Sequence, residues 1–514
     1  MGFLARQPQF NVASAQYLLY HFRTAMISHL PCLSLPESTT VQTLAALKPF
    51  LLLSILTCAS GSTSLPGYEL YDAEFRKVLA LKFVAAGERS LELLQGLLVY
   101  SLWYPFHLRP RNIQKFQYLR MVSDLVHDLG LDGPNLAEPP FQSSADRIER
   151  LRIYLGFTYA DSVFTMCWQA LKRTIPDDPS WTLRCCDELE HLTSTESDLT
   201  LVYLARLGVM NLQASSFIFD RSSCSSSNLE LLLLGLQTQL HQLQERVPVH
   251  IALSTPTELA VLFINLYLNA AGILQRLGHY NSTPSSAKPA VSCPDPYKLV
   301  QAVHSAKSFL NHILALSKKE FSTLTAADWC RIVLGIIVSL RLSLPIIGCP
   351  EFDSAWARRE IRLIEFLERL SSQDGDDNKE IVTTESRGDK ANSKVDIAAA
   401  TRVVFRVVKN KFQESIQAAT QQGDREKGNE ASAVKFSCPM LDGSMEAYLP
   451  TLGSGVSVPA EPLITTAMIG GGLGGAHEDS ACLRNGWAPE YPRQHVFHDI
   501  WATMTIGWAE EGSE

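Results

Sequence analysis

Hydrophobic residues recur every three or four positions through most of the chain, the spacing that places them on one face of an α-helix. Residues 113–130 show this pattern clearly, and Gly130 stands where such a helix would end. The apolar positions of this stretch are Ile113, Phe116, Leu119, Val122, Leu125, Val126 and Leu129. The spacing predicts a helix over residues 113–130.

A second stripe follows Asn228, which we expect to cap a helix N-terminus. Its members are Leu229, Leu232, Leu233, Leu236, Leu240 and Leu243. Comparable patterns cover residues 145–172, 198–217, 256–277, 297–316, 326–342, 353–371 and 396–420. Breaks rich in Pro, Ser and Gly separate them, and convincing strand pairs are absent from the sequence. The prediction is an all-α fold, a layered multi-helix array.

The stretch "GERSLELLQGLLVYSLWYPF", residues 87–106, is apolar nearly all the way round. A helix of this kind is buried on most sides. We expect Leu91, Leu94, Leu97, Leu98 and Trp103 to face the core, with Gly96 letting a neighbouring helix approach closely. Residues 88–90 are expected to keep the first turn in water.

Two segments lack helical periodicity, and they set the expected domain boundaries. Residues 371–396 are polar and charged and predict a disordered insertion. From residue 423 the chain becomes rich in Gly and Pro. We therefore expect an all-helical domain over 1–422, a flexible linker over 423–496 and an acidic, aromatic terminal segment over 497–514.

Composition narrows the class of protein. Hydrophobic residues make up 46% of the chain and charged residues 19%, which permits a large core. A formal net charge of -8 argues against gripping a nucleic-acid backbone unaided, because that needs a basic face. The 11 cysteines are scattered without a C-x-x-C pair, as in a reducing compartment. The apolar run 47–60 is too short for a membrane span, so we expect a soluble, intracellular protein.

Candidate catalytic and metal-binding residues are few and poorly spaced. "GGGLGG" at 470–475 satisfies G-x-G-x-x-G, but no strand precedes it and no helix follows, so a flexible linker is the better interpretation. His127 with Asp128, and His107 near Arg109, are candidate acid/base pairs, yet a helix-surface histidine is the more economical interpretation of His127.

Cysteine and arginine positions give equally weak signals. Cys185, Cys186 and His191 supply too few ligands for a closed zinc site. Arg173 is expected to cap a helix C-terminus, with contact to a ligand as the alternative. We therefore predict no catalytic, cofactor-binding or metal-binding residue.

The C-terminal segment gives a clearer indication of function. Acidic side chains there alternate with large apolar ones, the pattern of a segment that stays solvated until a partner's groove accepts it. The candidate partner-contacting residues are Phe497, Ile500, Trp501, Met504 and Trp508. Docking of this segment on the protein's own core is the alternative, and periodicity does not separate the two.

Four ordered segments, 16–37, 47–60, 74–132 and 150–174, resemble the regulatory middle region of fungal binuclear zinc cluster transcription factors. Residues 436–444 and 497–511 are similar to the C-terminal end of that family. The family's six-cysteine cluster has no counterpart, because only Cys32 and Cys58 precede Cys167. We therefore carry over no zinc ligand and expect zinc only if a cluster lies N-terminal to this sequence.

The resemblance implies a nuclear transcription regulator, not an enzyme, that controls a metabolic or secondary-metabolite gene set. It would act through other transcription regulators or coactivators, as a homo- or heterodimer, or by sensing an effector. It would reach DNA only indirectly and would not contact a membrane. The alternative is an all-α small-molecule-binding protein or enzyme unrelated to transcription, which requires polar residues that converge in an apolar pocket.

Overall fold

Helices stacked in layers make up the fold, and no strand occurs among the residues that the structure describes. This confirms the all-α prediction. The computed structural model describes residues 12–63, 68–103, 115–133, 144–167, 179–193, 195–219, 226–279, 294–346, 349–372 and, beyond these, 402, 405–406, 408–414 and 416–417.

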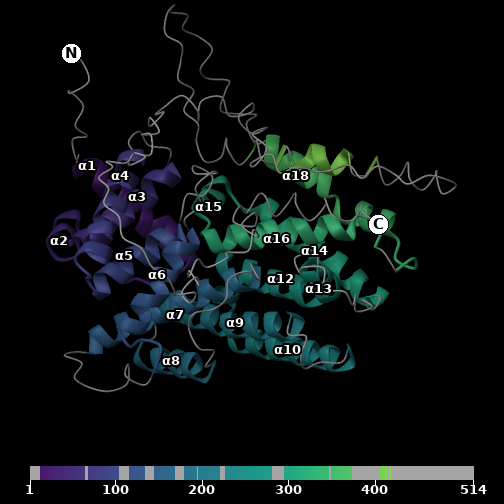
Figure 1. Cartoon of the computed structure of the whole chain (residues 1–514), viewed down its shortest axis with the longest axis horizontal. Coiled ribbons are helices and arrows are strands. Elements are labelled where there is room, and N and C mark those ends of the chain that lie inside the picture. The colour runs from purple at the N-terminus through teal and green to yellow at the C-terminus, as the bar shows by residue number, and fades with distance from the viewer. Residues whose placement is uncertain are drawn as a thin grey trace, which may run out of the picture.

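The N-terminal helices form the first layer, at the left of Figure 1. α3 and α5 lie at its centre, with α4 and α6 packed beside them. The elements are α1 (Val12–His21), the π-helical turn η1 (Phe22–Met26), the 3₁₀ turn η2 (Ile27–His29), α2 (Val41–Leu47), α3 (Pro49–Thr63), α4 (Tyr68–Leu79), the π-helical turn η3 (Ala80–Ala85), α5 (Leu91–Leu102) and α6 (Lys115–Asp128).

The prediction for α5 is confirmed in its main points. Every residue from Leu93 to Leu102 is buried, and Ser90 caps the helix by accepting a hydrogen bond from the Leu93 N–H. A Cβ atom on Gly96 would lie 2.6 Å from Cδ1 of Phe50 on α3. Gly96 therefore allows the close approach of the two helices that its position predicts. Leu91, expected in the core, is only half-buried because it lies in the exposed first turn.

The second layer contains the longest helices. α7 (Ser144–Cys167) packs along α9 (Glu196–Phe219), with α8 (Pro179–Leu192) and α10 (Ser226–Arg246) beside them. Among the described residues, α9 is the one helix long and apolar enough to cross a membrane by length and composition. Its packing against α7, α8, α10 and α12 is that of a core helix, and its buried Asp198 pairs with Arg152 at 2.6 Å.

The third layer consists of the later helices of the chain, which pack against both other layers. α16 contacts α7, α12 and α14, so its apolar middle is enclosed. The elements are α11 (Val249–Ala252), α12 (Thr255–Asn269), α13 (Ala271–His279), α14 (Pro296–Ala315), α15 (Lys318–Thr323), α16 (Ala326–Leu342), α17 (Ser354–Ile361) and α18 (Leu363–Ser372). Figure 1 places α14, α16 and α18 on the opposite side of the molecule from α2.

The structure corrects three predictions of helix boundaries. Asn228 is not a cap, because α10 begins two residues earlier, at Ser226. The stretch 256–277 divides at Ala270 into α12 and α13. The stretch 353–371 divides at Arg362, whose φ of 52° is left-handed and ends α17. Gly130 ends α6 with a φ of 63°, as predicted.

Candidate functional site: a polar pocket beside a buried ionic cluster

The structure describes two of the sequence candidates, His127 with Asp128 and Cys185 with Cys186 and His191. His127 is exposed on α6, where its Nδ1 lies 2.8 Å from Asp132 Oδ2 and this hydrogen bond raises its pKa. Asp128 instead pairs with Arg89, at 2.5 Å. His127 is therefore a helix-surface histidine, and its carboxylate partner is Asp132 and not Asp128.

Cys185 and Cys186 are buried in α8, with the Cys186 thiol 3.9 Å from the Val202 carbonyl of α9, while His191 is exposed. Burial raises the pKa of the Cys185 thiol to about 12 and raises that of Cys186 as well, so neither forms a thiolate readily. No group of three or more His, Cys, Asp or Glu side chains that could hold a metal ion occurs within the part of the chain that the structure describes.

Several predictions fall outside the described residues. These are the partner-contacting residues Phe497, Ile500, Trp501, Met504 and Trp508, the His107–Arg109 pair, Arg173 and the glycines of 470–475. They stay predictions from the sequence.

Four buried polar side chains meet where the three layers join, and we call Tyr159, Asp328, Arg331 and His29 the ionic cluster. Arg331 on α16 is 1% exposed, and its Nη1 donates to Asp328 Oδ1 at 2.7 Å. Its Nη2 donates to the hydroxyl of Tyr159 on α7. Burial raises the pKa of Tyr159 to about 12, although Arg331 opposes the shift, so the phenol stays neutral.

The two carboxylate oxygens of Asp328 accept hydrogen bonds from different partners. Its Oδ2 accepts hydrogen bonds from the N–H and hydroxyl of Thr325, at 2.9 and 2.7 Å, which completes a capping box at the start of α16. Its other oxygen, Oδ1, holds Arg331. The buried guanidinium therefore has one charged and one neutral acceptor, the pairing that a buried charge requires.

His29 connects the cluster to the N-terminal layer. Its Nε2 lies 3.1 Å from the hydroxyl oxygen of Thr323, whose own proton is directed to backbone carbonyls of α15. His29 therefore donates through Nε2, and Nδ1 keeps a lone pair. Nδ1 has no hydrogen-bond partner, since Asp328 Oδ2 is 3.8 Å away. Burial lowers the pKa of His29, and the carboxylates of Asp328 and Glu320 only partly oppose this.

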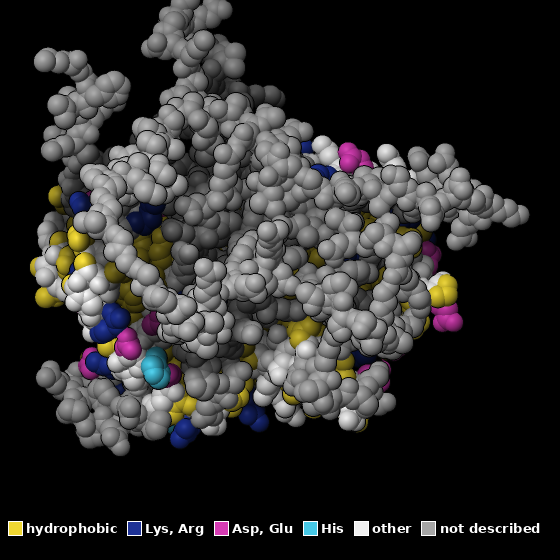
Figure 2. Space-filling model, viewed as in Figure 1, with side chains coloured by type: hydrophobic (Ala, Val, Ile, Leu, Met, Phe, Trp, Pro, Cys, Tyr) yellow, Lys and Arg dark blue, Asp and Glu magenta, His cyan; other side chains and the backbone are white. Residues whose placement is uncertain are grey.

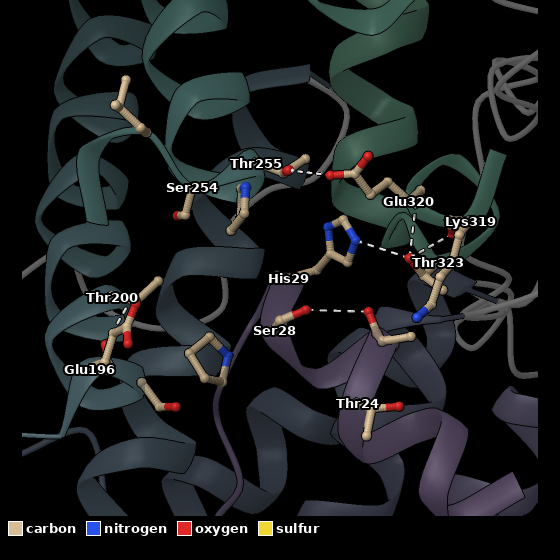
Figure 3. Close-up of a pocket in the computed structure, with 15 residues that line it drawn as sticks. Thr24, Ser28, His29, Glu196, Thr200, Ser254, Thr255, Lys319, Glu320 and Thr323 are labelled. Carbon is tan, nitrogen blue, oxygen red and sulfur yellow. Dashed lines mark hydrogen bonds between the residues drawn. The ribbon is translucent and has the colours of Figure 1, made fainter. Parts of the chain in front are cut away.

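A pocket of about 540 Å³ opens beside His29, and we call it the polar pocket. Figure 3 shows the imidazole projecting into it between Thr255 and Thr323. Four regions distant in sequence form its wall: η1 and η2, the start of α9, the start of α12, and α15. Its described lining is Thr24, Ala25, Ser28, His29, Pro31, Glu196, Ser197, Thr200, Leu253, Ser254, Thr255, Pro256, Lys319, Glu320 and Thr323.

Glu320 is the most firmly held carboxylate in that wall. Hydrogen bonds from Ser317 lower its pKa first, and Thr255 adds a further one at 2.9 Å. Glu320 therefore remains ionised and faces an already satisfied network. Ligand pockets are mostly apolar with a few converging polar groups, whereas this one is lined largely by hydroxyls and charged groups.

Sequence reasoning missed both the ionic cluster and the polar pocket. One signal was present: the T-x-x-D of Thr325 and Asp328 opens an otherwise apolar helix, and Arg331 follows one turn later. Charged residues on so apolar a helix need partners when they are buried. The sequence therefore indicates a buried ion pair, but it does not show which other helices surround that pair. His29 and Tyr159 carry no such signal.

Comparison with known proteins places the chain near fungal regulators. Transcription factor himD of Aspergillus japonicus is 24% identical over 350 residues, which cover 65% of this chain and 56% of that protein. Transcription factor opdL of Penicillium oxalicum is 22% identical over 384 residues, which cover 70% of this chain and 65% of that protein.

The matched part therefore spans less than two thirds of the length of either relative. No protein-family profile matches the chain, and no solved structure matches it. Both relatives are named as transcription factors, a class of protein that is not enzymatic. The chain is similar, at low identity and over about two thirds of its length, to fungal transcription factors.

Proposed function

We propose that this chain is a transcription regulator whose helical array is a regulatory scaffold. The observation that carries the proposal is its similarity to himD and opdL over 65% and 70% of the chain. The helical array is consistent with a scaffold, because helices from distant parts of the sequence share one core and one buried ionic cluster. A change at one layer can therefore reach the others.

The finer form of the proposal is a nuclear regulator of the binuclear zinc cluster type that contacts DNA through a partner. The resemblance of residues 16–174 to that family's middle region supports the type. The formal net charge of -8 supports indirect contact with DNA, because an acidic chain gains little from counterion release. Control of a metabolic or secondary-metabolite gene set belongs to the same proposal.

Two features, one of the structure and one of the sequence, support action through protein partners. The first is an apolar edge on α1 and α2, where Val12, Tyr17, Tyr20 and Leu47 are between 45% and 78% exposed. Figure 2 shows hydrophobic side chains gathered at that left edge of the molecule. The second is a feature of the sequence alone, the alternation of acidic and aromatic residues over 497–514. Exposed aromatic residues are enriched where proteins bind one another, because they bury much area at small entropic cost.

The test is a fusion of residues 1–514 to a foreign DNA-binding domain, with a reporter gene behind its binding site. The proposal predicts altered reporter transcription relative to the DNA-binding domain alone. Replacing Trp501 and Trp508 by alanine then tests the terminal segment, with Trp487→Ala as the matched control. Unchanged transcription from a well-expressed fusion would count against a regulatory role.

A further inference from the structure

The polar pocket exposes mainly hydrogen-bond acceptors. Five of its seven lining hydroxyl groups give their protons to the protein itself, mostly to carbonyls one helical turn earlier. Their oxygens therefore keep lone pairs but offer few donors to a ligand. These five hydroxyls belong to Thr24, Ser28, Thr200, Thr255 and Thr323, and the other two belong to Ser197 and Ser254.

The charges in the pocket also favour a ligand that bears hydrogen-bond donors. Glu196 and Glu320 are carboxylates, Lys319 is the one cationic side chain of the described lining, and His29 is neutral near pH 7. The lining is therefore net negative. The Nδ1 of His29 is itself buried and lies 3.8 Å from Asp328, so it adds no acceptor to the pocket wall.

We propose that the polar pocket binds a small, water-soluble compound bearing primary ammonium groups, such as a diamine or polyamine. An ammonium group has three donors and no acceptor, which matches an acceptor-rich, net negative wall. A volume of about 540 Å³ holds a molecule of that size. The binding stands independently of transcription, and only its use as an effector signal rests on the proposed function.

The position of the pocket explains how such a ligand would influence the fold. It contacts η2 through His29, α9 through Glu196 and α12 through Thr255, which belong to three different layers. His29 in turn lies beside Asp328 of the ionic cluster. A ligand bound there bridges the layers and stabilises their mutual packing by mass action.

The direct test is calorimetric titration of the full chain with spermidine, with sorbitol at the same concentration as a neutral, hydroxylated probe. We expect saturable binding of spermidine with one site and none of sorbitol. Glu196→Gln should weaken spermidine binding by about tenfold, the loss of one charge-assisted hydrogen bond. Glu230→Gln on α10 removes the same charge far from the pocket and should change affinity by less than about twofold.

A second pair of variants guards against simple misfolding, because it predicts tighter binding. Lys319→Glu places another acceptor on the pocket wall and should strengthen spermidine binding by roughly two- to fivefold. Lys318→Glu, on the neighbouring residue that does not line the pocket, should have a smaller effect. Equal effects within either pair, preference for sorbitol, or no saturable binding would overturn the proposal. The reporter experiment with the fusion tests the proposed function, and its result is independent of this binding test.

Discussion

Removal of the charge on Arg331 provides the sharpest test of the ionic cluster. Arg331→Met keeps an unbranched side chain of good helix propensity, so the change acts on the interactions and not on α16 itself. It removes the 2.7 Å bond to Asp328 and the bond to Tyr159, both within the core. Asp328 then remains a buried carboxylate held only by its capping bonds to Thr325.

The expected cost is about 3–5 kcal/mol of unfolding free energy, the range found when one partner of a buried ion pair is removed. A typical domain has about 5–15 kcal/mol in total, so this loss is a large share. Arg359→Met is the matched control, because its 3.8 Å pair with Asp353 has both side chains at least 60% exposed. Exposed pairs contribute at most about 1 kcal/mol.

Urea unfolding followed by circular dichroism measures both losses, with the slope against urea checked for constancy. The double variant Arg331→Met, Asp328→Asn adds a second measurement, because it removes the uncompensated charge. We expect it to be more stable than the sum of the single losses by about 0.5–3 kcal/mol. Equal losses for Arg331→Met and Arg359→Met, or strict additivity in the double variant, would refute a coupled buried cluster.

Three further predictions follow from single residues. Gly96→Ala should destabilise by about 1–3 kcal/mol through overpacking, whereas Gly235→Ala, with open space around it, should stabilise by about 0.4–1 kcal/mol; thermal unfolding measures both. Below its ordinary pKa of 6.5, His29 binds a proton more readily in the unfolded chain, so stability should fall from pH 7 to pH 5, and His29→Gln should flatten that slope in urea titrations. Cys185 and Cys186 should resist a thiol reagent until urea is added, as peptide mapping would show; rapid labelling in the native state would contradict their burial.

Most of the helices could be predicted from the sequence because burial follows periodicity. The stripe on α6 buries Leu119, Val122 and Leu125, and that on α10 buries Leu236 and Leu240. Gly96 and Gly130 were predictable because each has a local reason, close approach in one case and a left-handed helix end in the other. The boundary errors lie where the fold overrides local preference: Asn favours N-caps and Ala favours helix interiors, yet α10 begins before Asn228 and α12 ends at Ala270, its C-cap.

The polar pocket and the ionic cluster could not be predicted, because their residues lie far apart in the sequence. His29, Tyr159 and Asp328 are separated by more than one hundred residues from one another, and no local pattern states that their helices meet. Periodicity reports which face of a helix is buried, but not against which neighbour. The pairing of Asp328 with Arg331 was detectable because both lie on α16.

The central claim is that this helical array regulates transcription, and the fusion of residues 1–514 to a foreign DNA-binding domain tests it most directly. The account predicts a reproducible change in reporter transcription that Arg331→Met reduces and Arg359→Met leaves in place, at equal protein levels. A fusion that is folded and present in the nucleus but leaves the reporter at the level of the DNA-binding domain alone would contradict the claim.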